Sequence, residues 1–164
     1  MCLLSAPLAW AETATVELHQ ATLEGSGASI GSVTFTDVSD GVEIKTSLYG
    51  LPNGQHGFHI HENASCEPME KAGVMTPAQA AGGHYDPEKT GKHLGPDGGG
   101  HKGDLPRLTA NNEGRADGVM KVKDLTVSEI KNRSLMVHIG GDNYSDHPEE
   151  LGGGDGRFAC GIIR

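Results

Sequence analysis

The sequence predicts an all-β protein, an antiparallel sandwich or flattened barrel that carries two long loops. Three observations support this class. Short segments alternate apolar and polar residues with a period of two, and Gly, Ser and Asp separate them. Glycine contributes 25 of 164 residues and aromatic residues only 4%, which fits strands with large loops better than a helical bundle. The chain also lacks a clear amphipathic helical pattern.

The predicted strands number about eight and lie at 16–23, 29–38, 42–48, 57–61, 105–109, 115–122, 134–139 and 157–163. The alternation is plain in 42–48, where Val42, Ile44, Thr46 and Leu48 share one face. Segment 124–131 fits either a short helical turn or an extended link. The polar stretches 82–104 and 140–156 are expected to be long loops.

Length and charge narrow the class of protein. A chain of 164 residues can bury a real core, and residues 12–164 are assigned to a single domain. The net charge of −9 argues against nucleic acid as a partner. The same charge would repel small anions at long range.

Residues 1–11 read as the end of a secretory signal, because they are apolar, uncharged and close on Ala9-Trp10-Ala11, an A-x-A cleavage pattern. The positive n-region is missing, so we expect a signal truncated at its start and cleaved after Ala11. The alternative is an unstructured N-terminus; a membrane span is excluded by length. After cleavage two cysteines remain, Cys66 and Cys160, which predicts one disulfide in an exported protein.

The stretch 82–104 concentrates potential metal ligands. His84, His93, His101 and Asp104 follow one another at spacings of nine, eight and three, among many glycines. Such a segment has almost nothing apolar to bury, so an ordering agent is needed, and three imidazoles with a carboxylate suit tetrahedral Zn²⁺. The alternative is a flexible glycine-rich loop with incidental histidines.

Further histidines lie on predicted strands. His59 and His61 are two residues apart and project from the same strand face, and His138 lies within a later strand. Each could be a structural core histidine, but together with the loop residues they predict a shared metal site, since buried imidazoles need partners. The strand histidines offer only nitrogen, which suits copper. His84 is the candidate that belongs to both groups through its two ring nitrogens.

Three segments carry a resemblance to a known family. They are GFHIHE at 57–62, AGGHYDP at 81–87 and GRFACGI at 156–162. Together with the run that follows His138, they resemble the copper,zinc superoxide dismutases of the bacterial periplasmic kind, over residues 14–164. The resemblance implies an eight-stranded antiparallel Greek-key barrel.

The resemblance also implies a role for each matching residue. The implied copper ligands are His59, His61, His84 and His138. The implied zinc ligands are His84, His93, His101 and Asp104, with one ion of each metal per subunit. Cys66–Cys160 is implied as the intrasubunit disulfide, and Asp142 as the carboxylate that links a copper-ligand histidine to a zinc-ligand histidine.

The implied activity is disproportionation of two superoxide anions to O₂ and H₂O₂ by a copper ion that cycles between two oxidation states, as antioxidant defence in the periplasm. Arg157 would guide the anion beside copper, and His84 would supply a proton. Lys71 is the candidate steering cation, with Lys102 and Arg107 as alternatives; ordinary surface lysines are the other interpretation.

Two other functions fit the same residues. The chain could be a copper or zinc store without turnover, although an anion-guiding Arg157 argues against storage, or a β-sandwich binding module without metal. The expected partner is superoxide, with neither nucleic acid nor membrane, in a homodimer or a monomer. His56 and His147 are expected to be solvated.

Overall fold

The computed structural model describes residues 11–164. The signal predicted at 1–11 lies outside the described residues except for Ala11. Strands dominate this part of the chain: β1 Thr13–Thr22, β2 Gly25–Val38, β3 Gly41–Leu48, β4 Gly54–His56, β5 Phe58–His61, β6 Met69–Lys71, β7 Val74–Thr76, β8 Leu108–Ala110, β9 Ala116–Lys123, β10 Ser134–His138 and β11 Arg157–Ile162. The predicted all-β class is confirmed.

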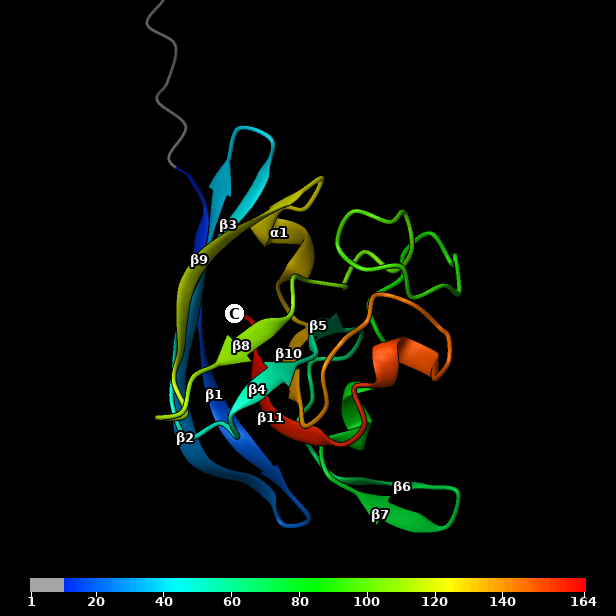
Figure 1. Ribbon diagram of the computed structural model, residues 1–164. Coiled ribbons are helices and arrows are strands. Elements are labelled where there is room, and N and C mark those ends of the chain that lie inside the picture. The colour runs from blue at the N-terminus through cyan, green and yellow to red at the C-terminus, as the bar shows by residue number, and fades with distance from the viewer. Residues whose placement is uncertain (1–10) are drawn as a thin grey trace, which may run out of the picture.

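Seven strands form one curled antiparallel sheet in the order β5-β10-β11-β1-β2-β3-β9. Strands that are distant in sequence are neighbours in it, as β1 with β11 and β3 with β9, which is the crossed connectivity expected of a Greek key. β4 pairs with β8 in a separate ribbon. In Figure 1 the strands β1, β2, β3 and β9 face β4, β5, β8, β10 and β11 across the interior.

The core fills this interior with the apolar face of each strand. Along β3 burial alternates, and Val42, Ile44, Thr46 and Leu48 are all buried, as predicted. Phe35 and Phe58 are among the largest fully buried side chains. Each such apolar side chain contributes roughly 1.5–3 kcal/mol when it leaves water.

The eight predicted strands all exist, but three short strands were not expected. β4 is only three residues long and continues into β5 through Gly57, so it has no pattern of its own. β6 and β7 pair in a hairpin whose residues 69–75 are exposed on both faces. Period-two alternation reports one buried face, so it cannot reveal such a hairpin.

The open segment 124–131 contains a helical turn, α1 Val127–Ile130. The Thr126 hydroxyl accepts from the Glu129 N–H at 3.3 Å, and the Glu129 carboxylate accepts from the Thr126 N–H at 3.1 Å. This reciprocal capping box starts the helix, while Val127 and Ile130 are buried in the core.

The two predicted long loops lie side by side next to the barrel (Figure 1). They contain no long helix or strand; the 3₁₀ turn Glu150–Gly153 lies in the second, and the turn Gln79–Ala81 lies just before the first. The Asp146 carboxylate accepts from the backbone N–H of His93 at 2.9 Å and from that of Leu151 at 3.1 Å. One side chain of the second loop therefore holds both loops together.

The predicted disulfide is confirmed, with 2.02 Å between the sulfurs of Cys66 and Cys160. It joins the segment that carries the β6–β7 hairpin to β11. Among residues 11–164, none of the helices has the length and apolar character to cross a membrane.

Candidate metal centre

Two neighbouring strands bring the strand histidines together. His59 and His61 lie on β5 and His138 lies on β10, its pairing partner. His84 joins them through an isolated bridge with His61. Each of these four buried histidines places one ring nitrogen so that all four nitrogens lie within 4.8 Å of one another. Strand pairing thus assembles the nitrogen-only group that the sequence predicted.

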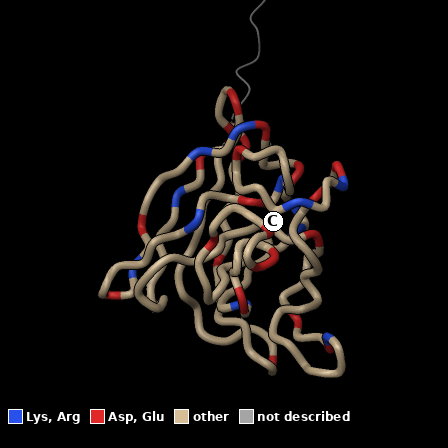
Figure 2. The backbone as a smooth tube through the Cα atoms, turned by 45° about the vertical axis from the view of Figure 1, so that its right-hand side comes forward, with Lys and Arg blue, Asp and Glu red and all other residues tan. Residues whose placement is uncertain are grey.

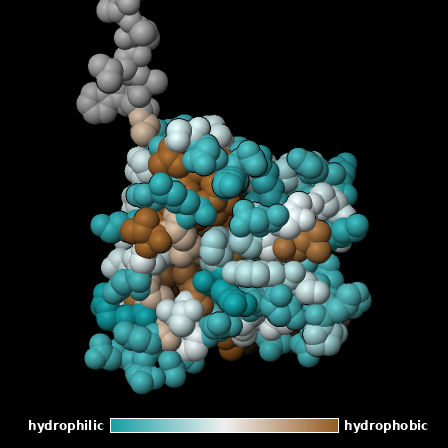
Figure 3. Space-filling view, turned by 45° about the horizontal axis from the view of Figure 1, so that its top comes forward, coloured by the Kyte–Doolittle hydropathy of each residue, from teal (hydrophilic) through white to brown (hydrophobic). Residues whose placement is uncertain are grey.

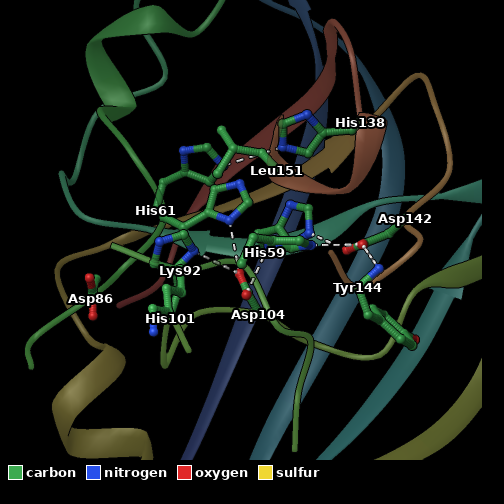
Figure 4. Close-up of polar contacts among 12 residues, drawn as sticks. His59, His61, Asp86, Lys92, His101, Asp104, His138, Asp142, Tyr144 and Leu151 are labelled. Carbon is green, nitrogen blue, oxygen red and sulfur yellow. Dashed lines mark hydrogen bonds and ion pairs between the residues drawn. The ribbon is translucent and has the colours of Figure 1, made fainter. Parts of the chain in front are cut away.

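The loop residues gather around the Asp104 carboxylate (Figure 4). His84 Nδ1 lies 2.8 Å from Asp104 Oδ1, His93 Nδ1 lies 2.9 Å from Oδ2, and His101 Nδ1 lies 3.5 Å from Oδ1. His84, His93 and Asp104 also share a 4.8 Å group with His59. His84 contributes to both clusters, with Nδ1 toward Asp104 and Nε2 free.

Several buried polar atoms in these clusters have no hydrogen-bond partner among residues 11–164. They are His59 Nδ1, His84 Nε2, His93 Nδ1, His101 Nδ1 and Asp104 Oδ2. In addition, His61 Nε2 faces His138 Nε2 at 3.4 Å. Buried donors and acceptors are normally paired, because an unpaired one costs free energy. Converging lone pairs of imidazole and carboxylate fit copper and zinc ions, which would satisfy them.

Burial and charge set the protonation of these groups. Burial lowers the pKa of His61 and of His138, and neighbouring imidazoles add to the effect. Burial likewise lowers the pKa of His84 to about 4. These rings are therefore neutral near pH 7, which is the state that binds metal. Burial alone would lower the pKa of His93 too, but the nearby carboxylates of Asp104 and Asp142 raise it to about 9.

Asp142 links the two clusters. His59 Nε2 and His93 Nε2 each donate to one of its carboxylate oxygens at 2.7 Å. Burial would raise the pKa of Asp142, but these bonds hold it well below the usual range, so the group is a carboxylate. Fixing the proton of each ring on Nε2 leaves Nδ1 of both histidines as the free ligand atom.

Arg157 lies at the start of β11, beside the strand histidines. Its guanidinium donates to the carbonyl oxygens of Ala78 at 2.5 Å and Gly82 at 2.6 Å. His61 Nδ1 bonds to the same Gly82 oxygen at 3.0 Å. Arg157 therefore holds the segment that the disulfide ties to β11, and its positive charge stays close to His61.

The candidate steering cations lie in different settings. Lys102 forms an ion pair with Glu129 at 2.7 Å, and Arg107 donates to the backbone oxygen of Asp142 at 2.7 Å. Lys71 is exposed on the β6–β7 hairpin, which projects from the body of the molecule (Figure 1). Figure 2 shows acidic positions spread over many loops, with basic ones between them.

One expectation was wrong: His56 is buried, not solvated. Its Nδ1 lies 2.8 Å from the His138 carbonyl oxygen and its Nε2 lies 2.8 Å from that of Pro52. His147 is exposed, as expected. No local signal separates the two, because the partners of His56 include a strand 82 residues away.

Comparison with known proteins agrees with the geometry. The family model described as copper/zinc superoxide dismutase (SODC) matches residues 29–163. The chain is 52% identical over 164 residues to a Brucella abortus protein named "Superoxide dismutase [Cu-Zn]", covering 99% of this chain and 94% of that protein.

Solved structures give the same result. The Cu/Zn superoxide dismutase from Brucella abortus superimposes with a TM-score of 0.90 at 53% identity, over 93% of this chain and 100% of that one. The monomeric copper, zinc enzyme from Salmonella enterica gives a TM-score of 0.82 at 47% identity, with the same coverage. Sequence, fold and the two ligand clusters agree, and the chain belongs to the copper/zinc superoxide dismutase family.

Proposed function

We propose that the chain disproportionates superoxide in the periplasm, with copper held by His59, His61, His84 and His138 and zinc held by His84, His93, His101 and Asp104. The observation that carries this proposal is the position of His84 between two buried ligand groups, with one ring nitrogen directed to each. His101 is preferred to His59 for zinc, because the one free nitrogen of His59 is needed to complete the four-histidine copper set, while His101 Nδ1 lies 3.5 Å from Asp104 Oδ1.

A bound copper ion would supply one-electron redox chemistry, by which two superoxide anions and two protons become O₂ and H₂O₂; zinc is not redox-active. Arg157 supplies the positive charge beside the copper group, against a net charge of −9 for the chain. Among residues 11–164, His84 Nε2 has no hydrogen-bond partner. With Nδ1 directed to zinc, this nitrogen could carry a proton for the product whenever it is not bound to copper.

Three facts support export to the periplasm. The relatives are bacterial, the chain has a disulfide, which persists in oxidising compartments, and Ala9-Trp10-Ala11 matches a cleavage site. The N-terminal residue of the protein purified from a periplasmic extract tests this, and Glu12 is the expected result. Sedimentation of the purified protein then shows whether it is a homodimer or a monomer; the Salmonella enterica enzyme is described as monomeric.

The deciding experiment measures superoxide disproportionation by the copper- and zinc-loaded protein and its Arg157→Ala variant. We expect rapid turnover that declines with salt and falls about tenfold or more in the variant, since a charge-lined site raises encounter rates by roughly 10–10³. Arg115→Ala is the matched control, because Arg115 pairs with Asp117 on the surface. Full metal occupancy without turnover would leave metal storage as the better function.

A further inference from the structure

Arg107 makes three contacts with the second long loop. Its backbone N–H donates to the Tyr144 hydroxyl at 3.0 Å, and its guanidinium Nη1 donates to the Asp142 carbonyl oxygen at 2.7 Å. The guanidinium carbon lies 4.9 Å from the centre of the Tyr144 ring, within the range of a cation–π interaction. Arg107 thus contacts the second loop through its backbone N–H, its guanidinium N–H and its positive charge.

Tyr144 is held in an unfavourable backbone conformation. Its φ is 59°, in the left-handed region, which is unfavourable for a residue with a Cβ because the Cβ comes too close to the following carbonyl oxygen. Such a conformation persists where surrounding contacts impose it. Here its N–H donates to Asp142 Oδ1 at 2.8 Å, and its ring packs so closely on Gly95 that a Cβ there would lie 2.6 Å from Tyr144 Cγ.

These contacts converge on one carboxylate. The Asp142 main chain is held by Arg107, and its two carboxylate oxygens accept from His59 and His93. Its Oδ1 also accepts from the Tyr144 N–H (Figure 4). We propose that Arg107 and Tyr144, here called the Arg107–Tyr144 clasp, are positioning residues. They orient the Asp142 carboxylate toward His59 and His93 and so fix the relative position of the two metal sites.

This inference rests on the proposed function, because it takes His93 as a zinc ligand. It also gives Arg107 a different role from substrate steering. A steering cation acts from a solvent-exposed position and loses its effect in salt, whereas this guanidinium is half-buried, stacked and hydrogen-bonded. Outer partners of metal ligands typically change metal affinity by roughly 10–100-fold when they are removed.

The test compares Arg107→Met with the fully loaded parent protein in two measurements that do not depend on turnover. The first is the rate at which zinc is released to a chelator. The second is the exchange rate, by NMR, of the imidazole N–H protons that His59 and His93 donate to Asp142. We expect both rates to rise about tenfold. Tyr144→Phe, which removes only the hydroxyl acceptor, should give a smaller rise in both.

Arg115→Met is the matched control, since Arg115 is exposed and pairs with Asp117; it should change neither rate. Arg107→Lys tests whether charge alone suffices, and we expect little rescue because a single ammonium cannot reproduce the planar stacked fork. If Arg107→Met folds poorly, Tyr144→Phe alone must still raise both rates.

A double variant separates this role from general stabilisation. If Arg107 acts through Asp142, then Arg107→Met combined with Asp142→Asn should release zinc no faster than Asp142→Asn alone. Additive effects would overturn the proposal, as would unchanged zinc release in Arg107→Met together with an altered salt dependence of turnover. A parent protein that binds no zinc would instead refute the proposed function, so the two failures are distinguishable.

Discussion

At the scale of single residues, the protonated ring nitrogen decides what each histidine can do. His59 and His93 each donate a hydrogen bond from Nε2 to Asp142, which leaves Nδ1 of both rings free to bind a metal. His84 instead bonds to Asp104 through Nδ1 and keeps Nε2 free. The hydrogen-bond partner of each histidine therefore decides which of its ring nitrogens is left free for a metal.

Asp142→Asn should weaken zinc binding by roughly 10–100-fold, since an amide cannot accept from both imidazoles. Competition with a chelator of known affinity measures this. Asp117→Asn, on the exposed side of the sheet, is the control and should bind zinc like the parent. Equal affinity in Asp142→Asn would mean that the carboxylate does not orient His93.

At the scale of elements, strand pairing fixes the positions of the strand histidines, and the loops carry the remaining candidate ligands. β5 and β10 pair with Met136 opposite His59 and Ser134 opposite His61, so their geometry is imposed by the sheet. The loops have few apolar side chains to bury. They are held instead by Asp146 and, at Gly82, by Arg157, while the Cys66–Cys160 bridge ties the segment before Gly82 to β11.

Removal of the disulfide, by Cys66→Ala with Cys160→Ala, should lower both stability and activity. The bridge closes 94 residues, for which the chain-entropy model gives about 4–5 kcal/mol before any strain is subtracted. Activity should fall because the Ala78 and Gly82 carbonyls that hold Arg157 lie in the released segment.

Urea denaturation of the metal-loaded variant measures the loss of stability. A loss of less than about 1 kcal/mol in the free energy of unfolding would show that closing the segment between Cys66 and Cys160 contributes little to stability.

At the scale of the whole molecule, the barrel encloses a continuous apolar core, and the polar candidate metal centre lies beside it. Figure 3 shows hydrophobic residues in separate groups among hydrophilic ones on one face. The net charge is −9, so an anionic substrate approaches against the overall field. At 0.15 M ionic strength screening acts over about 8 Å, and local cations then matter more than the total.

Lys71→Ala should reduce the second-order rate constant about twofold at low salt, with the difference vanishing near physiological salt. The reason is that Lys71 is exposed on the projecting hairpin and acts only through its field. Lys45→Ala, on β3, is the control. An effect that persists at high salt would point to a contact role instead of steering.

Metal removal should lower the stability of the two loops more than that of the barrel. A ligand present at 1,000 times its Kd adds about 4 kcal/mol to the free energy of unfolding, and here it also pairs the buried orphan atoms. Hydrogen exchange before and after chelation measures this. We expect lost protection in 82–104 and 140–156, with β1, β2 and β3 unchanged. Uniform loss would mean that the barrel itself depends on the metals.

The sequence by itself determined the class of fold, the segments that become the main strands and the kinds of metal ligand. Residues such as Val42 and Ile44 show their burial through periodicity, and His59 and His61 show their common face in the same way, because strand geometry is local. The match of three short segments to a family extended this to individual roles, which the geometry around His84 and Asp142 supports.

Only the tertiary structure decided which groups meet. Arg107 reaches Asp142 across 35 residues and His56 reaches His138 across 82, while Lys102 is paired with Glu129. In the sequence these are indistinguishable from solvated polar residues. Their partners come from distant loops and strands, and such long-range pairing follows from packing and leaves no periodic trace in the chain.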